Sequence, residues 1–182
     1  MLLSIMPLLM LAQQIVIDKA QYRSVYDLTL QCPIQVAWTL HACDLGETSR
    51  EPSWRFRNDI ANPAAHARHS DFARTGYHRG HLCPAQDRSY SMAAMKATFA
   101  LSNVAPQLPS VNCGVWKQTE NSCRIAASIY DSVCVLVCPV FLHRDTTHIG
   151  KHNLSVPHAF FKAVWRADND SVLNAWFVFN HQ

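Results

Sequence analysis

The sequence predicts one α+β domain built around a β-sheet. Of its 182 residues, 49% are hydrophobic and only 16% are charged, so the chain can bury a full core. That composition excludes a disordered chain and a coiled coil. Three runs rich in β-branched and aromatic residues are typical of strands, and two segments between them carry apolar residues at helical spacing. No internal repeat or Ser/Gly linker divides the chain, which favours a single domain.

The chain begins with an apolar segment, residues 1–14. It has the apolar centre of a secretory signal peptide but lacks a preceding Lys or Arg; alternatively it is the first strand or helix of the domain. The apolar run of residues 1–12 is shorter than the roughly 20 residues that cross a bilayer, so no membrane span is expected. On the signal interpretation, residues 15–182 form the domain and the protein is secreted or periplasmic.

Seven cysteines are many for a reduced compartment and fit an oxidising one. Because the number is odd, at least one thiol must stay unpaired or pair with another molecule. Cys83 and Cys113 fall inside the polar motifs described below, where either a disulfide or two small buried thiols would suit the sequence.

Strands are expected at residues 34–40, 133–141 and 174–179, where β-branched and aromatic residues dominate. A short helix is expected within residues 89–101, whose Met92, Met95 and Phe99 recur at helical spacing.

A second helix is expected to start near Asn112 and to end before the strand at residue 133. Trp116, Thr119 and Cys123 recur there at intervals of three and four. One helix would then present the amide of Asn112, the carboxylate of Glu120 and the guanidinium of Arg124 to one cleft. The simpler alternatives are an N-cap for the Asn and a solvated helix salt bridge for the Glu and Arg.

Polar residues are concentrated in the middle third of the chain, together with Gly76, Gly80 and Gly114, three of only five glycines. His81 follows Arg79 and Gly80 in a pattern typical of a strand end or turn. An imidazole presented to a cleft there, with an ordinary pKa of about 6.5, could act as a base at neutral pH. A surface or satisfied core histidine is the simpler alternative.

Three motifs follow one another over about forty residues: H-R-G-H-L-x-P from His78, L-S-N-V-x-P-Q from Leu101, and N-x-G-x-W from Asn112 with Glu120 four residues after the Trp. In these motifs the sequence resembles the DNA/RNA non-specific endonuclease family, whose active site is a ββα-metal motif. Further similar segments are V-A-W-T-L from Val36, P-V-F from Pro139, I-G-K from Ile149, and V-P followed by F-F-K from Val156. The resemblance runs from about Tyr22 to Phe179 and implies a mixed or antiparallel sheet core.

The resemblance also implies a hydrolase that cuts DNA and RNA with little sequence specificity, using one Mg²⁺ ion, or Mn²⁺ or another divalent ion. His81 would be the general base and Asn112 the direct protein ligand of the metal. Glu120 would orient metal-bound water, Asn103 would be a supporting amide, and Arg124 would bind phosphate oxygens.

For substrate binding we expect Arg79 and Arg55, with Arg50 and Arg57 as alternatives to Arg55. The net charge of +3 is modest for a protein that attracts polyphosphate. The oligomeric state is left open, with a homodimer as one alternative.

Two residues depart from the family pattern. His78 stands where the family usually has Asp, and Cys138 stands where a Gly usually precedes P-V-F. If the usual Asp anchors metal-bound water, an imidazole would weaken Mg²⁺ binding through lost attraction. Alternatively, His78 is tolerated because the metal is reached through Asn112 and waters.

Two other functions are compatible with the sequence. A catalytically impaired relative would hold nucleic acid without cutting it. A zinc-binding module would use two H-x-x-H pairs and a thiol, at His66, His69, His78, His81 and Cys83.

Overall fold

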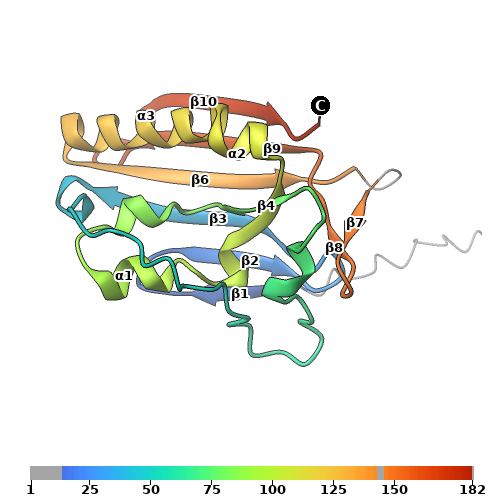
Figure 1. Cartoon of the computed structure of the whole chain (residues 1–182). Coiled ribbons are helices and arrows are strands. Elements are labelled where there is room, and N and C mark those ends of the chain that lie inside the picture. The colour runs from blue at the N-terminus through green and yellow to red at the C-terminus, as the bar shows by residue number, and fades with distance from the viewer. Residues whose placement is uncertain (1–13, 143–145, 182) are drawn as a thin grey trace, which may run out of the picture.

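A six-stranded antiparallel sheet forms the centre of the computed structural model, which describes residues 14–142 and 146–181 (Figure 1). Its strands lie in the order β1-β2-β3-β6-β9-β10. They are β1 (Gln14–Asp18), β2 (Arg23–Asp27), β3 (Cys32–His41), β6 (Ser132–Val140), β9 (Ala159–Arg166) and β10 (Val172–Phe179). The α+β class is therefore confirmed, and the sheet is antiparallel throughout.

The expected strands at residues 34–40 and 174–179 lie within β3 and β10, and the one at residues 133–141 matches β6 except for its last residue. In β6 every second residue is buried, as in a strand with one face against a core. β1, β2 and β9 were not expected; the first two are five residues long, too short for a clear alternation.

The helices lie on one face of the sheet (Figure 1). The long helix α3 (Val115–Tyr130) turns Trp116, Cys123 and Ala127 into the main core, where they meet buried residues of β3, β6 and β9. The short helix α1 (Met92–Ala97) lies within the segment expected to be helical. A smaller core packs Met95 and Phe99 against the loop that contains Trp54 and Phe56.

The second expected helix is interrupted, which corrects that prediction. α2 (Pro109–Cys113) carries Asn112 and ends before α3 begins, with Gly114 between them. Gly114 has φ −102° and ψ −112°, and a Cβ there would lie 2.4 Å from the carbonyl oxygen of Ser110. The chain can therefore turn at this point only because residue 114 has no side chain.

Two hairpins and four short 3₁₀ turns complete the fold of the described residues. The hairpins are β4 (His78–His81) with β5 (Val104–Gln107), and β7 (His148–Ile149) with β8 (Leu154–Ser155). The 3₁₀ turns are η1 (Ala42–Asp44), η2 (His69–Phe72), η3 (Ala85–Arg88) and η4 (Leu101–Asn103).

The expected signal segment, residues 1–14, lies outside the described residues except for Gln14, which begins β1. No helix in the described part of the chain combines the length and apolar character that a membrane crossing needs. All seven cysteines are free thiols, so neither Cys83 nor Cys113 forms a disulfide. Cys83 is buried, as the alternative of small buried thiols expected, but Cys113 is exposed.

Candidate active site

The β4–β5 hairpin places the H-R-G-H motif beside the end of the S-N-V-A-P-Q motif. His78 pairs with Gln107 and His81 with Val104 across the two strands. A Cβ on Gly80 would lie 2.4 Å from Oε1 and 2.7 Å from Cβ of Gln107, so the fully buried Gln107 side chain occupies the space above this glycine. Gly80 therefore serves close packing between the two motifs.

The third motif fixes the backbone around His81. The indole nitrogen of Trp116 donates to the His81 carbonyl at 3.2 Å. The Asn103 side chain accepts from the Cys83 amide at 2.8 Å and donates to the carbonyls of Cys83 and Thr98 at 2.9 and 3.0 Å. Asn103 is fully buried and does not line the cavity described below; its hydrogen bonds hold the segment that follows His81.

His81 lies at the end of β4, as expected, but its environment is aromatic. The rings of Phe56 and Phe99 have their centroids 4.8 and 4.7 Å from that of the imidazole. Its Nε2 is buried and has no hydrogen-bond partner among the described residues. Burial, with a smaller contribution from the positive charge of Arg50, lowers the pKa of His81 to about 3. The expectation of an ordinary pKa of about 6.5 was wrong; His81 is neutral at physiological pH.

A cavity of about 550 Å³ brings the expected site residues together. From β4, α2 and α3 it is lined by His81, Asn112, Glu120, Arg124 and Arg79, and also by Arg50, Phe56 and Lys117. Five of its thirteen lining residues are expected site residues, and these five come from positions up to 45 apart in sequence (79 to 124).

The side chain of Asn112 is held by the residue that departs from the family pattern. Nδ2 of Asn112 lies 3.1 Å from Nδ1 of His78, and the thiol of Cys113 lies 3.8 Å from the same nitrogen. A neutral imidazole accepts at Nδ1 when its proton is on Nε2, so the amide donates and turns its nitrogen toward His78. No hydrogen bond to Oδ1 of Asn112 occurs within residues 14–142 and 146–181, and this oxygen is left for another ligand.

Glu120 lies in a charged but poorly hydrated environment. Burial raises the pKa of its carboxyl to about 7, and the nearby Lys162 opposes this rise. Lys162 is fully buried; its ammonium donates to Oγ1 of Thr119 at 3.0 Å and lies 3.7 Å from the centre of the Trp116 ring. The cation therefore sits beneath the site, with a hydroxyl and an aromatic face as its contacts.

Arg124 lines the cavity. The family resemblance implied that it binds phosphate oxygens, but in the structure its guanidinium already has other partners. Its Nη1 donates to Oδ1 of the fully buried Asp87 at 2.8 Å, and its Nη2 donates to Asn121 at 2.5 Å. Asp87 also accepts from the indole of Trp38 at 3.1 Å. The guanidinium is thus fixed in place by the core, and part of its hydrogen-bonding capacity is already used.

The two expected substrate-binding arginines are separated. Arg79 lines the cavity, with Nε and Nη2 donating to the His69 carbonyl at 3.1 and 2.8 Å. Arg55 lies outside it, and its Nη1 donates to the carbonyls of Pro52 and Trp54. Arg50, named as an alternative, lines the cavity instead, with its guanidinium carbon 4.9 Å from the centre of the Phe99 ring.

The histidines and cysteine of the zinc alternative do not gather into one site. Over the described ranges, no three His, Cys, Asp or Glu side chains are grouped so that they could hold a metal ion. The His66 ring stacks near His152, and His69 accepts from the Phe56 amide. The zinc-binding alternative therefore has no support in this part of the chain.

Sequence reasoning did not assign a role in the site to Asp87, Lys162 or Phe99. Lys162 carries one local signal, a charged residue directly after the F-F segment, whereas Asp87, between Gln86 and Arg88, carries none. Phe99 was interpreted as a core residue of a helix, and its contact with His81 arises only from the tertiary fold.

This site has the arrangement of the ββα-metal class. A hairpin and the helical segment after it present a histidine, an asparagine and a glutamate to one cavity. The model of the DNA/RNA non-specific endonuclease family matches residues 9–182, and the chain belongs to this family.

Relatives and a solved structure agree with this assignment. Mitochondrial Endonuclease G of Bos taurus is 33% identical over 157 residues, covering 81% of this chain and 52% of its own length. Mitochondrial Nuclease 1 of Schizosaccharomyces pombe is 32% identical over 156 residues, covering 79% and 48%. In the crystal structure of the EndoG/EndoGI complex, which concerns the mechanism of EndoG inhibition, one chain superposes with a TM-score of 0.81 at 25% identity. That match covers 91% of this chain and 74% of the other. The chain spans about half the length of the curated relatives it matches.

Proposed function

We propose that this protein hydrolyses phosphodiester bonds of DNA and RNA with little sequence preference, with a divalent ion of the Mg²⁺ type. One observation carries the proposal: His81 from β4 and Asn112 from α2 line the same cavity, with Glu120 beside them. Family membership supports a nuclease activity, and the cations of the cavity suit a polyanionic substrate.

The oxygen atoms of the cavity fit a hard divalent ion. Oδ1 of Asn112 and the carboxylate of Glu120 make no hydrogen bond or ion pair in the described structure. Mg²⁺ is bound by few protein oxygens and keeps several waters, so one amide oxygen with a nearby carboxylate is a suitable donor set. Asn112 would hold the ion and Glu120 would orient its waters. Once bound, the ion would neutralise charge that develops on the phosphate and on the leaving oxygen.

His81 would remove the proton from the attacking water. The pKa of about 3 leaves the imidazole unprotonated at physiological pH, as a base must be, but it also makes the imidazole a weak proton acceptor. The negative charge of a bound phosphate would raise its pKa toward the working range. Nε2 is enclosed without a partner, which leaves Nδ1 as the nitrogen to receive the proton. The hydrogen bond from Trp116 to the His81 carbonyl and the two flanking phenyl rings keep the imidazole in one orientation.

Arg79, Arg50 and Lys117 would hold the scissile phosphate and its neighbours. Contacts of this kind go to the sugar–phosphate backbone and carry no base information, which is consistent with cleavage that ignores sequence. Arg124, already bound to Asp87, would contribute one edge of its guanidinium.

The test is digestion of a plasmid and of a structured RNA with Mg²⁺, beside an EDTA control and the variant His81→Asn. Mg²⁺-dependent products from both nucleic acids, absent in the variant, would support the proposal. A mobility shift without products across Mg²⁺, Mn²⁺ and Ca²⁺ would overturn it in favour of a relative that binds nucleic acid without cutting. Zinc that survives EDTA dialysis at one equivalent would also count against it.

The location of the protein stays a prediction. Export was inferred from residues 1–14 and from the cysteine content, whereas the relatives named above are mitochondrial proteins. We propose export to an oxidising compartment; fractionation of the native host would test it, and a protein found only inside the cell would contradict it.

A further inference from the structure

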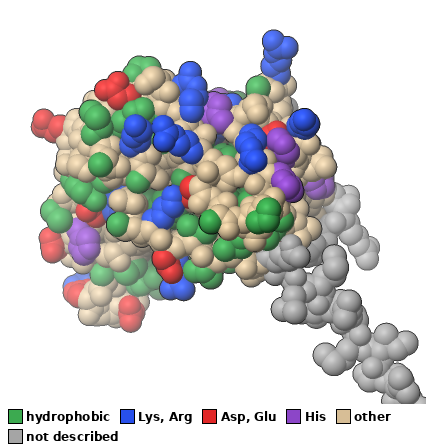
Figure 2. Space-filling view, turned by 90° about the horizontal axis from the view of Figure 1, so that it is seen from below, with side chains coloured by type: hydrophobic (Ala, Val, Ile, Leu, Met, Phe, Trp, Pro, Cys, Tyr) green, Lys and Arg blue, Asp and Glu red, His purple; other side chains and the backbone are tan. Residues whose placement is uncertain are grey.

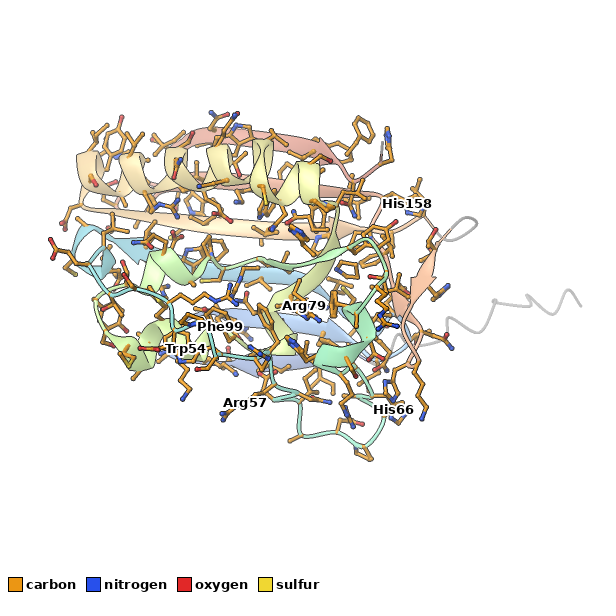
Figure 3. All side chains as sticks on the ribbon, viewed as in Figure 1. Trp54, Arg57, His66, Arg79, Phe99 and His158 are labelled. Atoms are coloured by element: carbon orange, nitrogen blue, oxygen red, sulfur yellow. The ribbon has the colours of Figure 1, made fainter. Side chains whose placement is uncertain are left out.

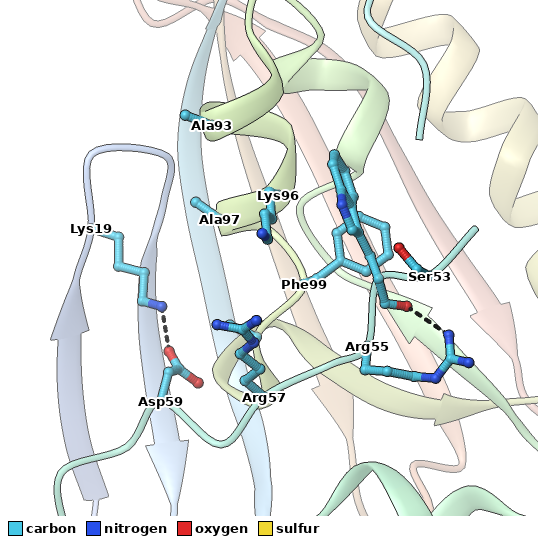
Figure 4. A pocket seen from close by; sticks show the side chains of 11 residues that line it. Lys19, Ser53, Arg55, Arg57, Asp59, Ala93, Lys96, Ala97 and Phe99 are labelled. Carbon is cyan, nitrogen blue, oxygen red and sulfur yellow. Dashed lines mark hydrogen bonds and ion pairs between the residues drawn. The ribbon is translucent and has the colours of Figure 1, made fainter. Parts of the chain in front are cut away.

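A second cavity of about 590 Å³ is drawn in Figure 4 with the side chains that line it. The ring of His81, which lines the active-site cavity, lies 4.7 Å, centroid to centroid, from the ring of Phe99, which lines the second cavity. Trp54 packs edge-on against the same ring at 5.3 Å and also lines the second cavity. A ligand in this cavity would therefore be separated from His81 by one ring. We call it the Arg57 pocket.

The Arg57 pocket carries an excess of positive charge. Its lining includes Lys19, Arg55, Arg57 and Lys96 but one carboxylate, Asp59. Asp59 is already engaged, because Lys19 lies 2.5 Å from its Oδ2 and Ser102 donates to it from both amide and hydroxyl. Among the described residues, the side chains of Arg55, Arg57 and Lys96 have no carboxylate partner. Three exposed cations thus face a concave surface without compensating charge.

The position of Arg57 is fixed by the fold. Its amide donates to the Phe99 carbonyl at 3.1 Å, and its carbonyl accepts from the Leu101 amide at 2.8 Å. This backbone bridge ties the loop to the segment that leads into β5, the partner strand of the active-site hairpin. In Figure 4 the guanidinium of Arg57 lies between Asp59 and the Lys96 ammonium. The backbone that carries Arg57 therefore has a set position relative to Phe99 and, through that ring, to His81.

The lining indicates which part of a polyanion would fit. Trp54 and Phe99 are buried, so they offer no free ring face on which a base could stack. Ala93 and Ala97 contribute only methyl groups, which allow an extended chain to approach closely. Cations with no stacking platform bind backbone phosphate and not bases. Figure 2 shows Lys and Arg side chains in several groups over the face seen from below Figure 1. Figure 3 places Arg57 near the lower edge of the molecule and Arg79 nearer the middle of the view.

We propose that the Arg57 pocket binds a backbone phosphate of the same nucleic acid strand whose scissile phosphate lies beside His81. This inference rests on the proposed function, since it concerns the same substrate. It identifies Arg57 and Lys96 as phosphate-binding residues distant from the reacting bond. It also predicts that the protein contacts several consecutive nucleotides of one strand.

Binding of a fluorescent oligonucleotide in EDTA tests the pocket without requiring cleavage. The probes are a single-stranded trimer and a 12-mer, measured by anisotropy over a range of salt concentrations. The double variant Arg57→Ala/Lys96→Ala is expected to bind the 12-mer about tenfold more weakly than wild type. The slope of log affinity against log salt concentration should become shallower by about one to two. Arg57→Lys should retain most of the affinity because it keeps the charge. Lys151→Ala removes an exposed cation outside both cavities and serves as the matched control; it should bind like wild type.

Wild-type affinity for the 12-mer in a double variant that keeps the thermal unfolding curve of wild type would overturn the inference. The inference would also be overturned if the double variant bound polyglutamate more weakly than wild type but bound the oligonucleotide equally well. The pocket would then suit an acidic protein partner. A failure of the proposed function is distinguishable: the protein would then cut no nucleic acid in Mg²⁺, whatever the binding data show.

Discussion

The imidazole of His78 accepts a hydrogen bond from the side-chain amide of Asn112, with Nδ1 and Nδ2 3.1 Å apart. His78 occupies the position where the family usually has Asp, and an Asp could accept the same bond. The departure therefore removes a negative charge but keeps an acceptor that turns the amide oxygen of Asn112 away from residue 78. In this chain His78 is best described as a residue that positions Asn112.

This relationship predicts the behaviour of three variants at position 78. His78→Asn keeps a neutral acceptor and should keep the Mg²⁺ affinity of wild type, and His78→Asp should match or raise it because a negative charge is added. His78→Ala frees the Asn112 amide to rotate and should weaken Mg²⁺ binding about tenfold. Isothermal titration with Mg²⁺ and Mn²⁺ measures this without substrate. A large loss in His78→Asp would show that the imidazole itself is needed.

Replacing His81 is expected to abolish turnover. His81→Asn keeps polarity in the aromatic pocket but removes the base, so cleavage should fall by about a hundredfold or more. Because His81 packs between Phe56 and Phe99, His81→Ala would also leave a space there and lower the unfolding temperature. Comparing the two variants by thermal unfolding and by rate separates the chemical loss from the structural one. Unchanged rates in His81→Asn would reject the assignment of the base.

The pH dependence of cleavage should report Glu120 and not His81. His81 has a pKa of about 3 and is already deprotonated across the measurable range, whereas Glu120, with a pKa of about 7, is protonated at lower pH. If the carboxylate form is needed, kcat/KM rises with pH through about 7, and the midpoint moves to lower pH as Mg²⁺ is increased. Glu120→Gln should remove this rise of kcat/KM with pH. Glu47→Gln, which replaces an exposed carboxylate, should leave the rise in place. A midpoint that survives in Glu120→Gln would contradict the prediction.

The same carboxyl group should make stability depend on pH. Its pKa rises from 4.5 to about 7 on folding, so the protonated form is favoured in the native state. Its contribution to stability is complete below about pH 4.5 and is lost as the pH rises through about 7. Denaturant unfolding in EDTA should therefore show wild type losing stability relative to Glu120→Gln over this interval. Parallel curves for the two proteins would show that the carboxyl is not desolvated.

Close packing between Gly80 and Gln107 can be tested by a double-mutant cycle. Gly80→Ala places a methyl group 2.4 Å from Gln107 Oε1 and should cost about 1–3 kcal/mol of unfolding free energy. Gln107→Ala removes the obstructing side chain, so the double variant should be more stable than the sum of the two single changes predicts. Additive effects measured by denaturant unfolding would mean that the hairpin moves to accept the methyl group.

Several parts of the site were predictable because their signal is local. The position of His81 at a strand end follows from the residues around it, and the strands β3, β6 and β10 follow from runs of β-branched and aromatic residues. The helical break at Gly114 was missed. The spacing of Trp116, Thr119 and Cys123 describes α3 well, but it does not show where the helix ends on the side of Asn112.

Other features depend on contacts between distant segments. The pKa of His81, the ion pair that occupies Arg124, and the choice of Arg50 over Arg55 as a cavity residue all arise from such contacts. None is encoded in spacing along the chain.

The sequence by itself determined the family, the α+β class and the residue types that the site contains, because motifs and side-chain periodicity are properties of neighbouring residues. Only the tertiary structure decided the protonation state and the orientation of these groups. Burial between Phe56 and Phe99 sets the protonation of His81, and the hydrogen bond to His78 sets the orientation of Asn112. Electrostatic and hydrogen-bonding energies depend on distance and hydration in three dimensions, and these are fixed only when the sheet, the hairpin and α3 have packed together.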